Sequence, residues 1–216
     1  MVITFANQKG GTGKTTIAIA FANYLSVNGI GLKVFDCDFQ ESIHEKYTFD
    51  ISSGKTPLYD VIYLDHDSIP DVDNLIEMSD SEELFVFDLP GSLDVNYVNL
   101  LHYSDYLIIP FEYSDVSMKS TIRFNEFLKV ISAESQRIFI RSKFDKGFSY
   151  PNKESFDSYL KEEAKYNRQV SIIEHPIYKR NVLQTIDTCS LTYRQKEAVI
   201  DAFKQVLELI KTPIVS

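Results

Sequence analysis

The sequence predicts an α/β fold: a doubly wound, mostly parallel sheet with helices on both faces. Short apolar segments alternate with helical segments along most of the chain, as in sheets whose strands are joined by helices. A glycine-rich turn links the first predicted strand directly to the first helix, and aspartates end two later strands. The chain of 216 residues has the length of one domain, so we expect 1–216 to fold as a single unit.

The predicted strands follow from runs of apolar residues. The first, Val2–Asn7, is short and apolar throughout, as a strand buried on both faces would be. Six similar runs follow, at 32–38, 58–64, 83–91, 104–111, 137–144 and 169–176.

The predicted helices follow from apolar residues at helical spacing. The first covers 14–29, where Asn28-Gly29 is typical of a helix end. The acid-rich segment Asp65–Glu83 is predicted as a solvated region of loop and helix. Further helices are expected at 94–102, 116–131, 153–166 and 193–211.

Composition excludes several classes of protein. No apolar run approaches the ~18 residues of a membrane span, and no signal segment begins the chain, so we expect a cytoplasmic protein without membrane contact. Cys37 and Cys189 lie far apart without metal-ligand spacing, which argues against a zinc or iron–sulfur site.

The charge is unevenly distributed. The net charge is -9, yet residues 136–216 hold 14 Lys and Arg against 10 Asp and Glu. This asymmetry is compatible with non-specific DNA binding by the C-terminal third, and equally with two differently charged solvated faces. The basic residues considered are Lys179, Arg180, Arg194, Lys196, Lys204 and Lys211.

The turn after the first strand reads KGGTGKTT, and it is predicted to bind phosphate. Glycines let backbone N–H groups approach phosphate oxygens, and the following helix adds the positive end of its dipole. Lys14 would reach the β- and γ-phosphates, and the Thr15 hydroxyl would bind Mg²⁺. Gln8 stands where the strict P-loop pattern has its first glycine, a position before the phosphate cradle itself. The nucleotide-binding residues predicted from this turn are Gly10, Gly11, Thr12, Gly13, Lys14, Thr15 and Thr16.

Aspartates follow two of the predicted strands. Asp88 ends the apolar run 84–87, where a Walker B aspartate would hold Mg²⁺. Asp36 and Asp38 alternate at the end of another strand, so their side chains are expected on one side and Cys37 on the other. Two carboxylates beside a metal–phosphate site can bind the cation and orient a water. We therefore predict Thr15, Asp36 and Asp88 as metal ligands, and a carboxylate of the Asp36–Asp38 pair as the group that orients a water.

These motifs resemble those of the ParA/MinD-type ATPases with a deviant Walker A motif, a family of P-loop NTPases. The first motif is complete as KGGTGKTT, Lys9–Thr16. The D-x-D-P-Q-like strand end is similar to Asp36–Gln40, with Phe39 in place of the usual proline. The Walker B region resembles Phe85–Gly91, and Glu174–Asn181 loosely matches a late segment near the base. The length suits the short ParA-like group, which lacks an N-terminal DNA-binding domain.

The resemblance implies roles for three residues. Lys9 matches the signature lysine, which crosses a face-to-face dimer and contacts the phosphates of the partner's ATP. Asp38 matches the aspartate that orients the attacking water, whereas Asp36 matches a more variable position. Pro176 falls in the segment near the base and is predicted to bind nucleotide. Lys9, Lys14 and Asp38 are therefore the predicted catalytic residues.

Together these features favour a weak ATPase, dependent on Mg²⁺, that dimerises on binding ATP and positions or segregates DNA, a plasmid or a mobile-element cargo. The resemblance implies a small ParB-like activator as a further partner. Alternatives are a MinD-like regulator at a membrane surface, a metabolic enzyme of the dethiobiotin-synthetase or nitrogenase-iron-protein type, and a scaffold that binds nucleotide without turnover.

Overall fold

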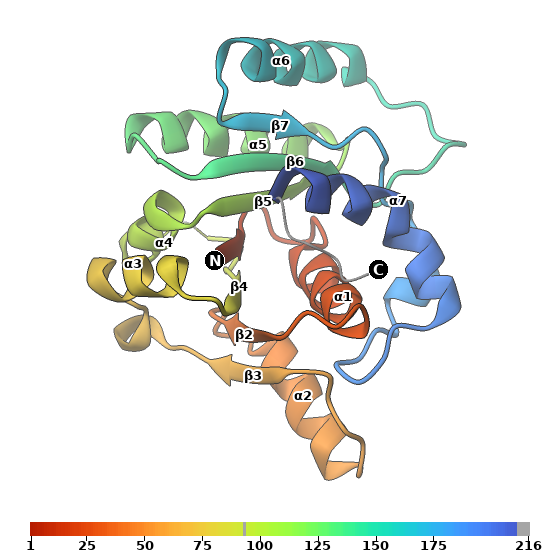
Figure 1. The fold of residues 1–216 in the computed structure, drawn as a ribbon. Helices are drawn as coiled ribbons and strands as arrows, with labels where there is room; N and C mark the ends of the chain where they lie inside the picture. The colour runs from red at the N-terminus through yellow and green to blue at the C-terminus, as the bar shows by residue number, and fades with distance from the viewer. Residues whose placement is uncertain (93, 211–216) are drawn as a thin grey trace.

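The computed structural model describes residues 1–92 and 94–210. Within them the chain forms a seven-stranded parallel sheet in the order β3-β2-β4-β1-β5-β6-β7 (Figure 1). Its strands are β1 (Val2–Phe5), β2 (Leu32–Asp36), β3 (Asp60–Tyr63), β4 (Leu84–Asp88), β5 (Tyr106–Phe111), β6 (Gln136–Arg141) and β7 (Val170–Ile172). This confirms the predicted fold class.

Helices cover both faces of the sheet (Figure 1). One face packs against α1 (Lys14–Val27), α2 (Ser42–Ser52) and α7 (Tyr193–Ile210). The other packs against α3 (Val72–Asp80), α4 (Val98–Tyr103), α5 (Asp115–Val130) and α6 (Lys153–Tyr166). Single 3-10 turns occur at η1 (His66–Ser68), η2 (Val95–Tyr97) and η3 (Asn181–Leu183).

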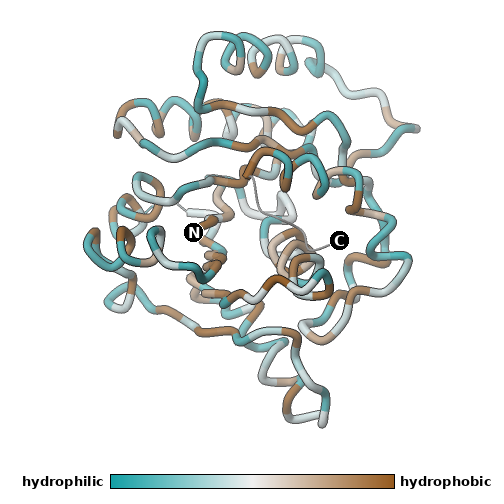
Figure 2. Tube along the Cα trace, in the orientation of Figure 1, coloured by the Kyte–Doolittle hydropathy of each residue, from teal (hydrophilic) through white to brown (hydrophobic). Residues whose placement is uncertain are grey.

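The central strands are apolar because both of their faces are buried. In β1, Val2 packs on the α3–α6 side, whereas Ile3 and Phe5 pack on the α1 side. The Phe21 ring of α1 packs edge-on against two other rings. Its centroid lies 5.8 Å from that of Phe5 in β1 and 5.2 Å from that of Phe203 in α7. Figure 2 shows hydrophobic residues along the strands and α1, and hydrophilic ones along much of α6. The β1–α1 junction is therefore held firmly at the centre of the molecule.

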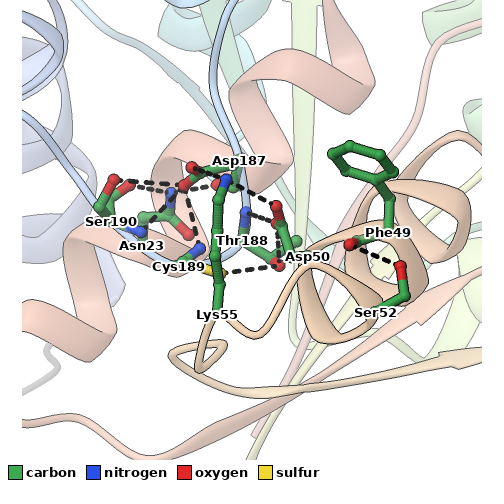
Figure 3. A network of polar contacts seen from close by, with 9 residues as sticks. All are labelled: Asn23, Phe49, Asp50, Ser52, Lys55, Asp187, Thr188, Cys189 and Ser190. Atoms are coloured by element: carbon green, nitrogen blue, oxygen red, sulfur yellow. Dashed lines mark hydrogen bonds and ion pairs between the residues drawn. The ribbon is translucent and has the colours of Figure 1, made fainter.

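A polar network ties the ends of several elements to α1 (Figure 3). The Lys55 ammonium lies 3.0 Å from an Asp50 oxygen at the end of α2 and 3.1 Å from an Asp187 oxygen in the loop before α7. Asp50 also accepts hydrogen bonds from the N–H and hydroxyl of Thr188, at 3.0 and 2.8 Å. Asn23 of α1 donates to the Asp187 carbonyl at 2.8 Å. We assign this cluster a structural role.

The structure differs from the sequence prediction mainly at element ends. Each predicted strand is present but shorter, because the strand pairing ends before the apolar run does or begins after it. Helix α2 was not predicted, and the helix predicted at 94–102 begins as the 3-10 turn η2. The predicted loop-and-helix region contains η1 and α3. Lys211, the predicted end of the last helix, lies outside the described residues. None of the helices in the described ranges has the length and hydropathy needed to cross a membrane.

Candidate functional site

The predicted phosphate-binding turn joins β1 to α1 at the carboxyl edge of the sheet. Gly11 and Gly13 have φ of 82° and 87°, a left-handed conformation that side chains with a Cβ adopt at a cost. Gly13 is the N-cap of α1, and no side chain caps this helix end. The N–H groups of the first turn are therefore left for a ligand, and an anion is the ligand that suits them.

Two residues that the sequence analysis missed hold this turn from behind. The Ser142 hydroxyl donates to the Thr12 carbonyl at 2.5 Å, and the Lys143 ammonium donates to the Gly11 carbonyl. Both follow β6, more than a hundred residues from the turn in sequence. With these carbonyls bound on one side, the peptide groups of the turn are fixed in orientation.

Two lysines approach each other at the turn. Lys14 is 6% exposed, and burial lowers the pKa of its ammonium. Asp88 and Asp38 raise this pKa, whereas the nearby Lys9 lowers it. Lys9 is half-buried, and its ammonium forms no ion pair with any described residue. The site thus gathers cationic groups whose mutual repulsion a bound polyphosphate would relieve.

Asp88 lies at the end of β4, beside β1 and β2 in the sheet. It is fully buried, and neither carboxylate oxygen has a hydrogen-bond partner of good geometry among the described residues. Burial raises the pKa of Asp88 to about 7, while the adjacent Thr15 hydroxyl and Lys14 ammonium lower it. A buried carboxylate without a partner needs a cation. With the Thr15 hydroxyl beside it, the oxygen donors fit Mg²⁺.

The two aspartates at the carboxyl end of β2, Asp36 and Asp38, lie in different environments. Asp36 is buried, and its Oδ2 accepts the N–H groups of Ile43 and His44 at 2.8 and 3.1 Å, at the start of α2. Asp38 is partly exposed in the turn after the strand, and its Oδ1 accepts the N–H of Gln40 at 3.0 Å. Asp36 thus helps to hold α2 in place, and its part in metal binding stays a prediction.

A cavity of about 650 Å³ opens beside the turn, and Asp88 is not among its lining residues. Gly13 and Thr16 form one wall, and aromatic side chains that sequence reasoning missed form others: Tyr113, Phe148, Tyr150 and Tyr178. Such a cavity suits a flat, partly apolar group next to a phosphate chain. Ile177 and Tyr178 line it, but Pro176 is not among its lining residues. The contact predicted for Pro176 therefore remains a prediction.

Gly91, in the loop after Asp88, packs directly on the phosphate-binding turn. A Cβ at this position would lie 2.9 Å from both the Cα and the N of Gly10, which is backbone and cannot swing aside. The segment after β4 and the turn after β1 are therefore in close contact. The sequence shows this glycine but not its neighbour.

We expect Gly91→Ala to weaken nucleotide binding because the added methyl group displaces the turn. Overpacking of this kind typically costs about 1–3 kcal/mol, which corresponds to a fall in affinity of roughly 5- to 150-fold. Titration with a fluorescent nucleotide measures the effect. Gly31→Ala is the matched control, because a Cβ at Gly31 meets no atom within 4 Å. Equal affinity of the two variants would contradict the contact.

We also expect a pH effect from Asp88 in the protein without metal. The ordinary pKa of 3.8 is raised to about 7 in the fold, so the folded protein holds a proton that the unfolded chain has lost. The free energy of unfolding therefore falls as pH rises from about 4 to about 7. The Asp88→Asn side chain does not ionise, so its free energy of unfolding should not fall in this way. In EDTA at pH 8, the Tm of Asp88→Asn should therefore exceed that of the wild type, and the difference in Tm should disappear at pH 4. A gap that stayed equal at both pH values would contradict the assignment.

Comparison with known proteins agrees with this geometry. Residues 3–211 match the CobQ/CobB/MinD/ParA nucleotide binding domain. No curated protein sequence matches significantly. Among solved structures, a protein assigned to plasmid partition from Borrelia burgdorferi B31, bound to AMPPNP, is 22% identical with a TM-score of 0.67, covering 95% of this chain and 98% of its own.

Two further structures share the fold. MinD from Aquifex aeolicus is 15% identical with a TM-score of 0.68, covering 96% of this chain and 97% of its own. The pNOB8 ParA bound to nonspecific DNA is 18% identical with a TM-score of 0.61, covering 97% of each chain. At these identities the likeness establishes the fold alone. The family match spans nearly the whole chain, and the protein therefore belongs to the CobQ/CobB/MinD/ParA nucleotide-binding family.

Proposed function

We propose that this protein is a Mg²⁺-dependent ATPase that forms a dimer around two ATP molecules and works in positioning or segregating DNA or a mobile-element cargo. The observation that carries the proposal is the position of Lys9. Lys9 is half-buried, its ammonium forms no ion pair with a described residue, and it lies close enough to Lys14 to lower the pKa of the Lys14 ammonium. A second lysine at this point is free to act on another nucleotide.

Within one chain, we assign each residue a role according to its position in the site. The backbone of 10–16 and Lys14 bind the phosphates, and Thr15 and Asp88 hold the cation, with Asp36 as a further candidate ligand. When bound, Mg²⁺ would offset negative charge on the transferring phosphoryl group. Asp38 is close enough to Lys14 to raise the pKa of its ammonium, which supports a place for the Asp38 carboxylate near the γ-phosphate. There it would orient the attacking water.

A second copy of the chain would bring Lys9 to the opposite phosphate. This arrangement delivers a cation in trans to the charge of the transition state, as arginine fingers do. Exposed apolar side chains on the same edge of the molecule support a surface that is covered in a dimer. Phe39, Val95 and Val116 follow the carboxyl ends of β2, β4 and β5, and they are 72%, 80% and 64% exposed.

DNA is the partner that we propose for the basic residues of the C-terminal third. Four of the predicted basic residues (Lys179, Arg180, Arg194 and Lys204) are exposed, Lys196 is partly so, and none forms an ion pair with a described residue. One structural relative is bound to nonspecific DNA. The apolar face of α7 packs in the core, so α7 offers no apolar face to a membrane surface.

Two measurements test the proposal together: the oligomeric state of the protein and its rate of ATP hydrolysis. Light scattering should show a monomer with ADP and a dimer with MgATP. Phosphate release should be slow with ATP alone, and faster when DNA and a cognate activator protein are added. A protein that stays monomeric at saturating MgATP and releases no phosphate would contradict the proposal.

A further inference from the structure

Tyr97 connects the segment after Asp88 to the turn that carries Asp38. The tyrosine belongs to η2 and is 3% exposed. Its hydroxyl donates to the Cys37 carbonyl at 3.0 Å. His66 Nδ1 lies 3.4 Å from the same hydroxyl oxygen. When His66 carries its proton on Nδ1, that N–H donates to the Tyr97 hydroxyl oxygen. The Tyr97 hydroxyl then still donates its own proton to the Cys37 carbonyl.

The bond from Tyr97 completes the restraint of a single peptide group. The Cys37 carbonyl and the Asp38 N–H belong to the peptide that immediately precedes the Asp38 side chain. Tyr97 holds the carbonyl, and Asp36 Oδ1 accepts the N–H at 3.2 Å. The N–H of Cys37 donates to the Asp88 carbonyl at 3.0 Å. The backbone on the N-terminal side of Asp38 is thus held by polar partners from two neighbouring segments.

Two residues that follow β4 contact neighbouring turns. Gly91 packs against Gly10, and Tyr97 binds the Cys37 carbonyl. The Tyr97 hydroxyl thus acts on the peptide that carries Asp38. Because a displacement of about 1 Å can cost on the order of 100-fold in rate, the hydroxyl of Tyr97 is well placed to control turnover.

We propose that Tyr97 is a positioning residue, which fixes the orientation of Asp38 for hydrolysis through the Cys37–Asp38 peptide. This inference rests on the proposed ATPase function, in which Asp38 orients water. It concerns turnover and not nucleotide binding, because in the described residues the Tyr97 hydroxyl bonds to Cys37 and His66 and to no glycine or lysine of the turn.

The test compares Tyr97→Phe with Tyr59→Phe, a control variant that also loses one buried, hydrogen-bonded hydroxyl. Tyr59 is also buried, and its hydroxyl donates to Asn23 at 2.8 Å, in the network around Asp187. We expect Tyr97→Phe to lower kcat by about 10- to 100-fold with KM for ATP unchanged, and Tyr59→Phe to leave both constants near wild type. Equal kcat in the two variants would overturn the inference.

Two further measurements separate this inference from the proposed function. Hydrogen exchange at the Asp38 amide should be faster in Tyr97→Phe than in Tyr59→Phe, and this readout does not require any ATPase activity. Unchanged exchange overturns the inference even where the wild type hydrolyses ATP. A wild type without turnover overturns the proposed function instead. The double variant Tyr97→Phe with Asp38→Ala should lose no more activity than Asp38→Ala alone; an additive loss would show that Tyr97 acts elsewhere.

Discussion

Replacement of Asp38 by alanine should abolish ATP hydrolysis and leave nucleotide binding near the wild-type level. We expect kcat to fall by about 10²–10⁴-fold, the usual contribution of a group that assists proton transfer to or from a reacting water. Binding should persist because the Asp38 carboxylate accepts the Gln40 N–H and forms no hydrogen bond with the phosphate-binding turn among the described residues. Phosphate release measures turnover, and a fluorescent nucleotide measures affinity.

The control for Asp38→Ala is Asp201→Ala, which removes an exposed carboxylate from α7. It should change neither quantity. If Asp38→Ala instead lost nucleotide affinity with kcat intact, Asp38 would be a binding residue and the assigned role would be wrong.

Replacement of Lys9 by alanine should remove both ATP-dependent dimerisation and hydrolysis. A cation supplied in trans contributes roughly 10³–10⁵-fold in rate in related phosphoryl-transfer systems. Nucleotide binding by the monomer should remain, because Lys14 and the glycine backbone are untouched. Removing Lys9 also takes away a charge that lowers the pKa of Lys14, so Lys14 should stay charged.

Lys46→Ala is the matched control for Lys9→Ala, since Lys46 is an exposed lysine on α2 without an ion pair to a described residue. Light scattering with MgATP and phosphate release should both match the wild type for this control. Full dimerisation and full turnover by Lys9→Ala would exclude a role for this lysine across the dimer.

The sequence predicted those parts of the fold that depend on local patterns. Buried strands have apolar runs, and the glycine-rich turn has its own signature, so the β1–turn–α1 unit was predicted before the structure. Helix α2 was missed because its buried side chains are only Ile43 and Asp50. Two buried positions do not make an apolar stripe, and one of them is a carboxylate held by Lys55 and Thr188.

The residues of the candidate site likewise fall into those that local sequence patterns predict and those that they do not. Parallel strands end at one edge of the sheet, which is why Asp88 and the turn with Lys14 and Thr15 could be placed together from sequence. Ser142, Lys143 and Tyr97 could not be predicted, since each acts through a hydrogen bond to a backbone carbonyl far away in sequence. No pattern in the chain marks such a bond. Asp36 is a related case: its spacing suggests a pair with Asp38, and only the structure reveals its bonds to α2.

In the proposed dimer, Lys9 acts on the partner's ATP while Asp38 acts on its own chain's ATP. Mixing Lys9→Ala with Asp38→Ala tests this arrangement most directly, because each variant alone is expected to be inactive. In a mixed dimer, the site on the Lys9→Ala chain keeps its own Asp38 and receives Lys9 from the other chain. Lys9→Ala chains are not expected to pair with each other, so the dimers in the mixture are mixed dimers or Asp38→Ala dimers. One of the two sites is complete in each mixed dimer, so a mixed dimer should recover about half of the turnover of a wild-type dimer. If the mixture stayed as inactive as its components, Lys9 would not act across a dimer, and the account would be wrong.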